Sequence, residues 1–203
     1  MEQLRILVRT GTFRFTERTK KQLLWDVHAI IGAEKKTHAE KELFETERKN
    51  FQLPPLHHVW LDDAWDEIEI LGFPLCSAFK LIASPIRRSP ADCILAADLK
   101  NNTGKEISIT GYLVATKPTR TKHGEPMMFG TFLDRKGFFF DTTHFPKVVA
   151  RFPFRGRGCY EIKGRVDEEF GFCSITVSEM QRVDYVERFA EKPEGKAAEP
   201  AAS

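Results

Sequence analysis

The sequence predicts an α+β protein in which a small helical N-terminal segment precedes a five-stranded β-barrel and a disordered C-terminal tail. Apolar residues recur at helical spacing early in the chain, as at Leu4, Leu7 and Val8. From about Ile107 the hydrophobic period changes to two, which is typical of β-strands. From Glu191 onward no large apolar side chain occurs, and such a segment cannot bury enough surface to fold.

These patterns divide the chain into four segments. We assign residues 1–50 to the helical segment, 51–100 to a connector, 101–186 to the barrel and 187–203 to the tail. In the helical segment, Gly11 ends a first helix, and a second helix begins after Thr16 and ends near Gly32. Six Lys or Arg residues lie between Arg5 and Lys21, and they indicate either a solvated helix surface or a contact with phosphates.

The barrel is predicted from five alternating segments. The first three strands are expected at 107–115, 127–134 and 138–145. The fourth strand is expected to place Tyr160, Ile162 and Val166 on one face, and the fifth is expected to do the same with Cys173, Ile175 and Val177. The first strand is expected to place Ala115 on the same face as Ile107, Ile109, Gly111 and Leu113. A short helix at 146–152 separates the third and fourth strands, and this element order is that of an OB-fold barrel.

Charge and aromatic residues indicate a nucleic-acid-binding surface on this barrel. The formal net charge of the chain is only +2, but Lys105–Arg165 holds twelve Lys or Arg against five Asp or Glu. A basic loop at 117–123 is predicted between the first two strands, and we expect Phe129 on the outer face of the second strand as a platform for base stacking. The candidate binding residues are Lys117, Arg120, Lys122, Phe129, Thr131, Arg155 and Arg157.

The orientation of the third strand stays open at this point. One face holds Phe138, Phe140, Thr142 and His144, and the other holds Phe139, Asp141, Thr143 and Phe145. Asp141 resists burial unless it is paired, which favours the first set as the inner face. A β-bulge would change that register.

No motif for catalysis or for a metal ion is found, and we expect neither in this chain. The acidic run at 62–71 predicts an exposed helix face, and Asp134 and Asp141 are expected to organise a turn. The chain has no apolar run long enough for a membrane span and no signal-peptide pattern, which predicts a cytoplasmic protein without membrane contact. Its four cysteines form no C-x-x-C pair and are expected to be reduced.

Three motifs, in order, resemble the C-terminal region of the bacterial DNA polymerase III alpha subunit, in its Bacteroidetes-type form. Residues 4–25, LRILVRTGTFRFTERTKKQLLW, resemble the end of its helix-hairpin-helix region. EIEILGFPL at 67–75 resembles the segment before its OB domain. The OB domain itself is matched by GYLVATKPTRTKHGEPMMFGTFLD at 111–134 and FFDTTHFP at 139–146.

The resemblance implies a C-terminal fragment of a replicative DNA-directed DNA polymerase, a magnesium-dependent nucleotidyltransferase whose catalytic domain is missing here. We therefore expect no cofactor and no activity from this chain alone, and binding of single-stranded template DNA during DNA replication. The expected protein partners are the remainder of the polymerase and other replisome subunits. Two alternatives stay open: a module that docks a replisome protein, and an OB domain that binds structured RNA.

Overall fold

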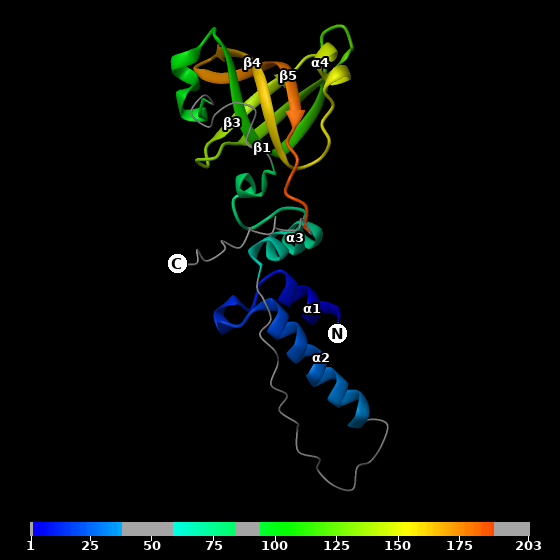
Figure 1. Cartoon of the computed structure of the whole chain (residues 1–203). Helices are drawn as coiled ribbons and strands as arrows, with labels where there is room; N and C mark the ends of the chain where they lie inside the picture. Colours follow the sequence, from blue (N-terminus) through cyan, green and yellow to red (C-terminus); the bar gives the residue numbers. More distant parts are fainter. Residues whose placement is uncertain (1, 38–58, 84–93, 189–203) are drawn as a thin grey trace, which may run out of the picture.

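The computed structural model describes residues 2–37, 59–83 and 94–188, and within them a helical part lies below a β-barrel (Figure 1). The helices and 3-10 helices are α1 (Glu2–Arg9), η1 (Arg14–Thr16), α2 (Lys20–Thr37), α3 (Trp60–Leu71), η2 (Ala78–Leu81), η3 (Ala96–Asn102) and α4 (Pro146–Arg151). The helix predicted to end near Gly32 thus continues to Thr37. The tail predicted from residue 187 lies outside the described residues, except for its first two residues.

The barrel confirms the predicted fold class. Its strands are β1 (Glu106–Arg120), β2 (Pro126–Leu133), β3 (Phe139–His144), β4 (Cys159–Glu169) and β5 (Phe172–Arg182). They close in the order β1-β2-β3-β5-β4, with β3 and β5 parallel and the other neighbours antiparallel. With α4 between β3 and β4, this is the five-stranded OB-fold arrangement.

Two stacked phenylalanines fill the middle of the barrel. The ring centroids of Phe132 and Phe140 lie 5.5 Å apart, and both side chains are buried. Gly111 leaves room for them, because a Cβ at this position would lie 2.6 Å from Phe140 Cζ and 2.8 Å from Phe132 Cβ. The packing of these two rings therefore requires a glycine at position 111 of β1.

A β-bulge divides β1 into two halves with opposite orientation. Before it, Ile107, Ile109 and Leu113 point into the core. The pairing of β1 with β2 shifts between Leu113 and Ala115, so Ala115 is exposed and pairs with Thr131. The prediction that Ala115 shares the inner face was wrong, because one extra residue in a strand reverses the alternation that follows it.

Ion pairs join helix α3 to the N-terminal part of the chain. Arg9 pairs with Asp66 at 2.9 Å, Lys20 with Asp63 at 3.3 Å and Lys21 with Asp62 at 3.4 Å. Arg14 also pairs with Glu67. Asp66 and Glu67 are 7% and 1% exposed, so the acidic run is not the exposed face that we predicted. These four cations compensate the negative charge of α3.

The segment after β5 returns to the same helix. The Val186 amide donates to the Leu81 carbonyl at 2.7 Å, and Trp65 Nε1 donates to the Val186 carbonyl at 3.1 Å. Arg188 then pairs with Asp66 at 2.9 Å. The segment that follows β5 therefore ties the barrel to α3 and η2, in addition to the chain that precedes the barrel.

The role of Gly111 can be tested with two small substitutions. We expect Gly111→Ala to lower the free energy of unfolding by about 1–3 kcal/mol, because the added methyl group overpacks the Phe132–Phe140 stack. Ala115→Val enlarges an exposed position of the same strand and should change it by less than about 0.5 kcal/mol. Urea unfolding followed by circular dichroism measures both. Equal stability of Gly111→Ala and the unaltered protein would contradict this packing.

Candidate nucleic-acid interface

The basic segment between the first two strands is a β-hairpin and not the loop that we predicted. β1 continues to Arg120 and β2 begins at Pro126, so Lys117 lies on a strand. The Arg120 guanidinium donates to the Gly124 carbonyl at 2.8 Å, which fixes it against the turn. Of the three predicted loop cations, only Lys122 lies in the turn itself.

Three rows of side chains cross the outer face of β1, β2 and β3. Residues that pair across neighbouring strands share a face. The rows, read from β1 to β3, are Lys117–Phe129–Thr143, Ala115–Thr131–Asp141 and Tyr112–Leu133–Phe139. The second half of β1 joins this face because of the bulge, which brings Lys117 directly beside Phe129.

Phe129 lies where the alternation of β2 predicted it. Its side chain is 40% exposed, whereas the next inward residues, Gly130 and Phe132, are buried. Thr131 is half-buried and donates a hydrogen bond to Asp141 Oδ1 at 2.7 Å. That bond holds the Asp141 carboxylate against the sheet, one row away from the Lys117–Phe129 row. The role of these residues in binding stays a prediction.

The structure decides the orientation of β3 that the sequence left open. Phe140, Thr142 and His144 are buried, and Asp141 is exposed. Phe138 departs from the inner set because it precedes the strand, in the turn, and is 54% exposed. The unfavourable burial of Asp141 therefore indicated the correct inner face within β3. It did not apply to Phe138, which lies just before the strand.

His144 is an uncharged histidine inside the barrel. It is fully buried, its Nε2 lies 2.9 Å from Thr142 Oγ1, and its ring centroid lies 4.6 Å from that of Phe154. Burial lowers the pKa of His144 from 6.5 to about 4, because the apolar surroundings disfavour the charged ring. His144 therefore packs in the core beneath the outer face and is not exposed on that face.

Asp134 organises the turn between β2 and β3, as the sequence predicted. It is 2% exposed, and its Oδ1 accepts hydrogen bonds from the amides of Lys136 and Phe138 at 2.8 and 2.9 Å. Its Oδ2 accepts from the Ala96 amide at 3.0 Å, which attaches the segment before β1. All three donors are backbone groups, so this carboxylate acts as part of the scaffold.

Arg155 and Arg157 lie away from the hairpin, in the segment that leads to β4. The Tyr160 hydroxyl fixes this segment by donating to the Gly156 carbonyl at 2.6 Å and accepting from the Arg155 amide at 2.9 Å. Arg157 lies over Phe73, with its guanidinium 5.9 Å from the ring centroid. These two predicted binding residues therefore belong to a different segment from the hairpin that carries Lys117.

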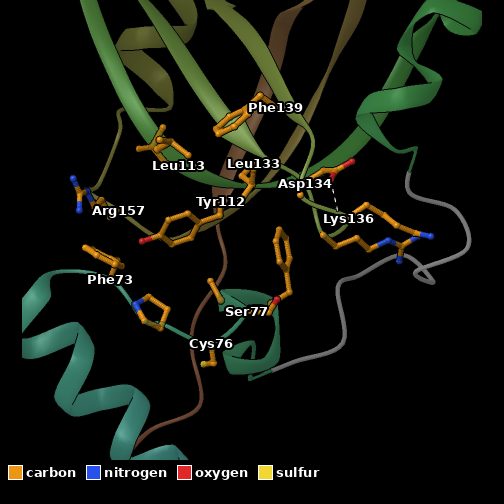
Figure 2. Close-up of a pocket in the computed structure, with 16 residues that line it drawn as sticks. Phe73, Cys76, Ser77, Tyr112, Leu113, Leu133, Asp134, Lys136, Phe139 and Arg157 are labelled. Atoms are coloured by element: carbon orange, nitrogen blue, oxygen red, sulfur yellow. Dashed lines mark hydrogen bonds between the residues drawn. The ribbon is translucent and has the colours of Figure 1, made fainter. Parts of the chain in front are cut away.

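Arg157 lines a pocket of about 630 Å³ between η2 and the barrel (Figure 2). Its apolar walls include Phe73, Tyr112, Leu133 and Phe139. Burial raises the pKa of the Tyr112 hydroxyl, and the nearby charge of Arg157 opposes that rise. The sequence did not predict this pocket, because its walls come from four separate segments of the chain, at residues 73–79, 112–114, 133–139 and 157.

Three exposed phenylalanines were not among the candidate binding residues that the sequence indicated. Phe139 is 66% exposed on the outer face, and Phe170 and Phe172 are 99% and 80% exposed at the turn between β4 and β5. In OB-folds this turn flanks the binding face. For Phe170 and Phe172 the sequence signal was the pattern Phe-Gly-Phe, since the glycine predicts a turn and turns lie at the protein surface.

The described residues contain no group of three or more metal-ligating side chains that could hold an ion. None of the helices at 2–37, 59–83 and 94–188 is long and apolar enough to cross a membrane.

No protein-family model matches the sequence. DNA polymerase III subunit alpha of Aquifex aeolicus is 28% identical over 170 residues, which cover 80% of this chain and 13% of that protein. The chain resembles the alpha subunit of DNA polymerase III. The resemblance predicted from the three motifs is thus confirmed, and the chain spans about 13% of the length of this relative.

Solved structures of low sequence identity are similar to parts of the chain. The second OB-fold domain of replication protein A from Methanococcus maripaludis is 18% identical, with a TM-score of 0.32, over 42% of this chain and 90% of that one. The single-stranded DNA binding protein from Thermus aquaticus is 10% identical, with a TM-score of 0.36, over 40% of this chain and 41% of that one.

The buried state of His144 predicts a specific loss of stability in acid. Because the folded pKa of about 4 lies below the ordinary 6.5, the unfolded chain takes up a proton first as the pH falls. Stability should therefore be lost between pH 6.5 and pH 4, by up to about 3 kcal/mol from this residue. Urea unfolding at a series of pH values measures the loss.

Two variants isolate the contribution of His144. His144→Gln should flatten the pH dependence between pH 6.5 and pH 4, whereas His123→Gln, at an exposed position of the hairpin turn, should leave it unchanged. The same pH dependence in His144→Gln and the unaltered protein would show that His144 is not the group responsible.

Proposed function

We propose that this chain binds single-stranded DNA through the outer face of β1, β2 and β3. The observation that carries the proposal is the pairing of Lys117 with Phe129 across β1 and β2. It sets a cation beside an exposed ring on a rigid sheet, which suits a nucleotide because the base stacks on the ring and the phosphate meets the ammonium group.

The surroundings of this pair support the same ligand. Thr143 completes the row on β3 and offers a hydroxyl group. Arg120 and Lys122 continue the positive charge into the hairpin beyond Lys117. A hairpin held by its own hydrogen bonds presents these cations without the loss of entropy that a loose loop would suffer on binding.

The similarity to a polymerase subunit suggests which strand is bound. We propose the template strand during DNA replication, with the remainder of the polymerase and other replisome subunits as protein partners. Magnesium-dependent nucleotide transfer would belong to parts of the relative beyond the 13% that this chain matches. The chain by itself is expected to incorporate no nucleotide.

A second candidate function, docking of a protein partner, is favoured by the turn between β4 and β5. Phe170 and Phe172 are highly exposed there, and Asp167, Glu168 and Glu169 precede them. Asp167 pairs with Arg165 at 2.9 Å, but Glu168 and Glu169 repel phosphates, so this turn is a poor extension of a DNA-binding face. Exposed rings beside acidic groups suit a basic protein surface with apolar pockets.

Phe129 provides the first test of DNA binding. We expect Phe129→Ala to weaken binding of fluorescein-labelled oligo-dT by about 1–3 kcal/mol, or roughly 5- to 100-fold, because one stacked base is lost. Phe15→Ala removes a ring that is 79% exposed in the N-terminal part and should bind normally. Fluorescence anisotropy at constant salt measures all three proteins. Equal affinity of Phe129→Ala and Phe15→Ala would exclude stacking on Phe129.

Lys117 provides an independent electrostatic test. For a single strand, each phosphate contact contributes about 0.7 to the slope of log K against log salt concentration. Lys117→Ala should therefore reduce that slope by about 0.7 and weaken binding most at low salt. Lys100→Ala, at an exposed position of η3, is the matched control and should leave the slope unchanged.

The outcomes also separate the alternatives. Absence of oligo-dT binding at low salt would exclude the proposed function and favour protein docking. Tighter binding of a folded RNA than of oligo-dT would favour the RNA-binding alternative. Nucleotide incorporation by the purified chain would contradict the proposal that catalysis lies elsewhere.

A further inference from the structure

The pocket between η2 and the barrel is continuous with the proposed DNA-binding face. Tyr112, Leu133 and Phe139 form the third row of the outer face and also line the pocket. Leu133 lies four positions after Phe129 in β2, which is about 13 Å along the strand. A strand that stacks on Phe129 and follows β2 therefore arrives at the pocket without leaving the protein surface.

The pocket walls suit a nucleobase. On the barrel side they include the rings of Tyr112 and Phe139, and on the η2 side those of Phe73 and Phe79. Figure 2 shows Phe73 and Tyr112 close together at one end, and the turn that contains Asp134 and Lys136 at the other. Its volume of about 630 Å³ is in the range of pockets that hold small organic ligands.

The charges of the pocket suit a phosphate group. Arg135, Lys136 and Arg157 line it, and none of the three makes an ion pair with another described residue. Asp134 is its acidic residue, and both carboxylate oxygens already accept backbone hydrogen bonds inside the protein. A ligand in the pocket therefore meets apolar rings and positive charge.

We propose that the pocket binds one nucleotide of the same DNA strand that lies on the outer face. The base enters between the Phe73–Phe79 wall and the Tyr112–Phe139 wall, and the flanking phosphates meet Arg157, Arg135 and Lys136. An apolar side chain of a protein partner fits the rings equally well, but it leaves these three cations without a counter-charge. This inference rests on the proposed function and assigns Arg157 to a subsite distinct from the hairpin.

Phe138 and Phe139 form a matched pair for the test. Both rings are exposed at the start of β3, but only Phe139 lines the pocket. We expect Phe139→Ala to weaken oligo-dT binding about 5- to 100-fold and Phe138→Ala to leave it unchanged. Arg157→Ala should reduce the slope of log K against log salt concentration by about 0.7, as Lys100→Ala should not.

A fluorescent base locates the nucleotide. A series of oligo-dT strands, each with 2-aminopurine at one position, is bound to the full chain. One position should show strong quenching that is relieved in Phe139→Ala and kept in Phe138→Ala and Phe129→Ala. Free dTMP at millimolar concentration should leave that quenching unchanged, because the strand holds its own nucleotide in place.

Each result supports or overturns the inference. If oligo-dT binds with equal affinity to Phe139→Ala and Phe138→Ala, and no position depends on Phe139, the pocket does not hold a nucleotide and the proposed function stands without it. If dTMP displaces the quenched base while the strand stays bound, the pocket is a site for a free nucleotide instead. If the unaltered chain binds no oligo-dT, the proposed function and this inference both fail.

Discussion

The bulge in β1 is the constraint on which the candidate interface depends. β1 is shared by two neighbours: its first half pairs with β4 and its second half with β2. The first half must point Ile107, Ile109 and Leu113 into the core. Without the bulge, the same alternation would turn Lys117 inward, where its charge could not be paired at low cost. The extra residue allows one strand both to close the barrel and to present a cation outside it.

The distribution of charge follows from a second constraint, the burial of acidic groups on α3. Glu67 is nearly inaccessible, and its Oε2 accepts a hydrogen bond from the Leu75 amide at 2.8 Å while Oε1 meets Arg14. A buried carboxylate needs such partners. The basic residues near the start of the chain supply much of this compensation. Among the described residues, Lys117 and Arg157 on the barrel side make no ion pair with an acidic group.

The barrel carries aromatic residues in two different electrostatic settings. Phe129 lies beside Lys117, and Phe139 lies where the outer face meets a pocket that contains Arg157. Phe170 and Phe172 follow three acidic residues. Because an exposed ring accepts a base or a protein side chain with similar ease, the charge around each ring decides which ligand it favours.

The sequence by itself determined the fold class, the order of the elements and the outward position of Phe129, because a period of two fixes which side chains share a face as long as a strand is regular. Tertiary structure decided the rest. A bulge placed Ala115 on the face opposite to the predicted one, and a turn separated Phe138 from the inner set of the third strand. The acids of α3 were buried by cations distant in the sequence. The pocket could not be predicted, because its walls meet only when η2 packs beside the barrel.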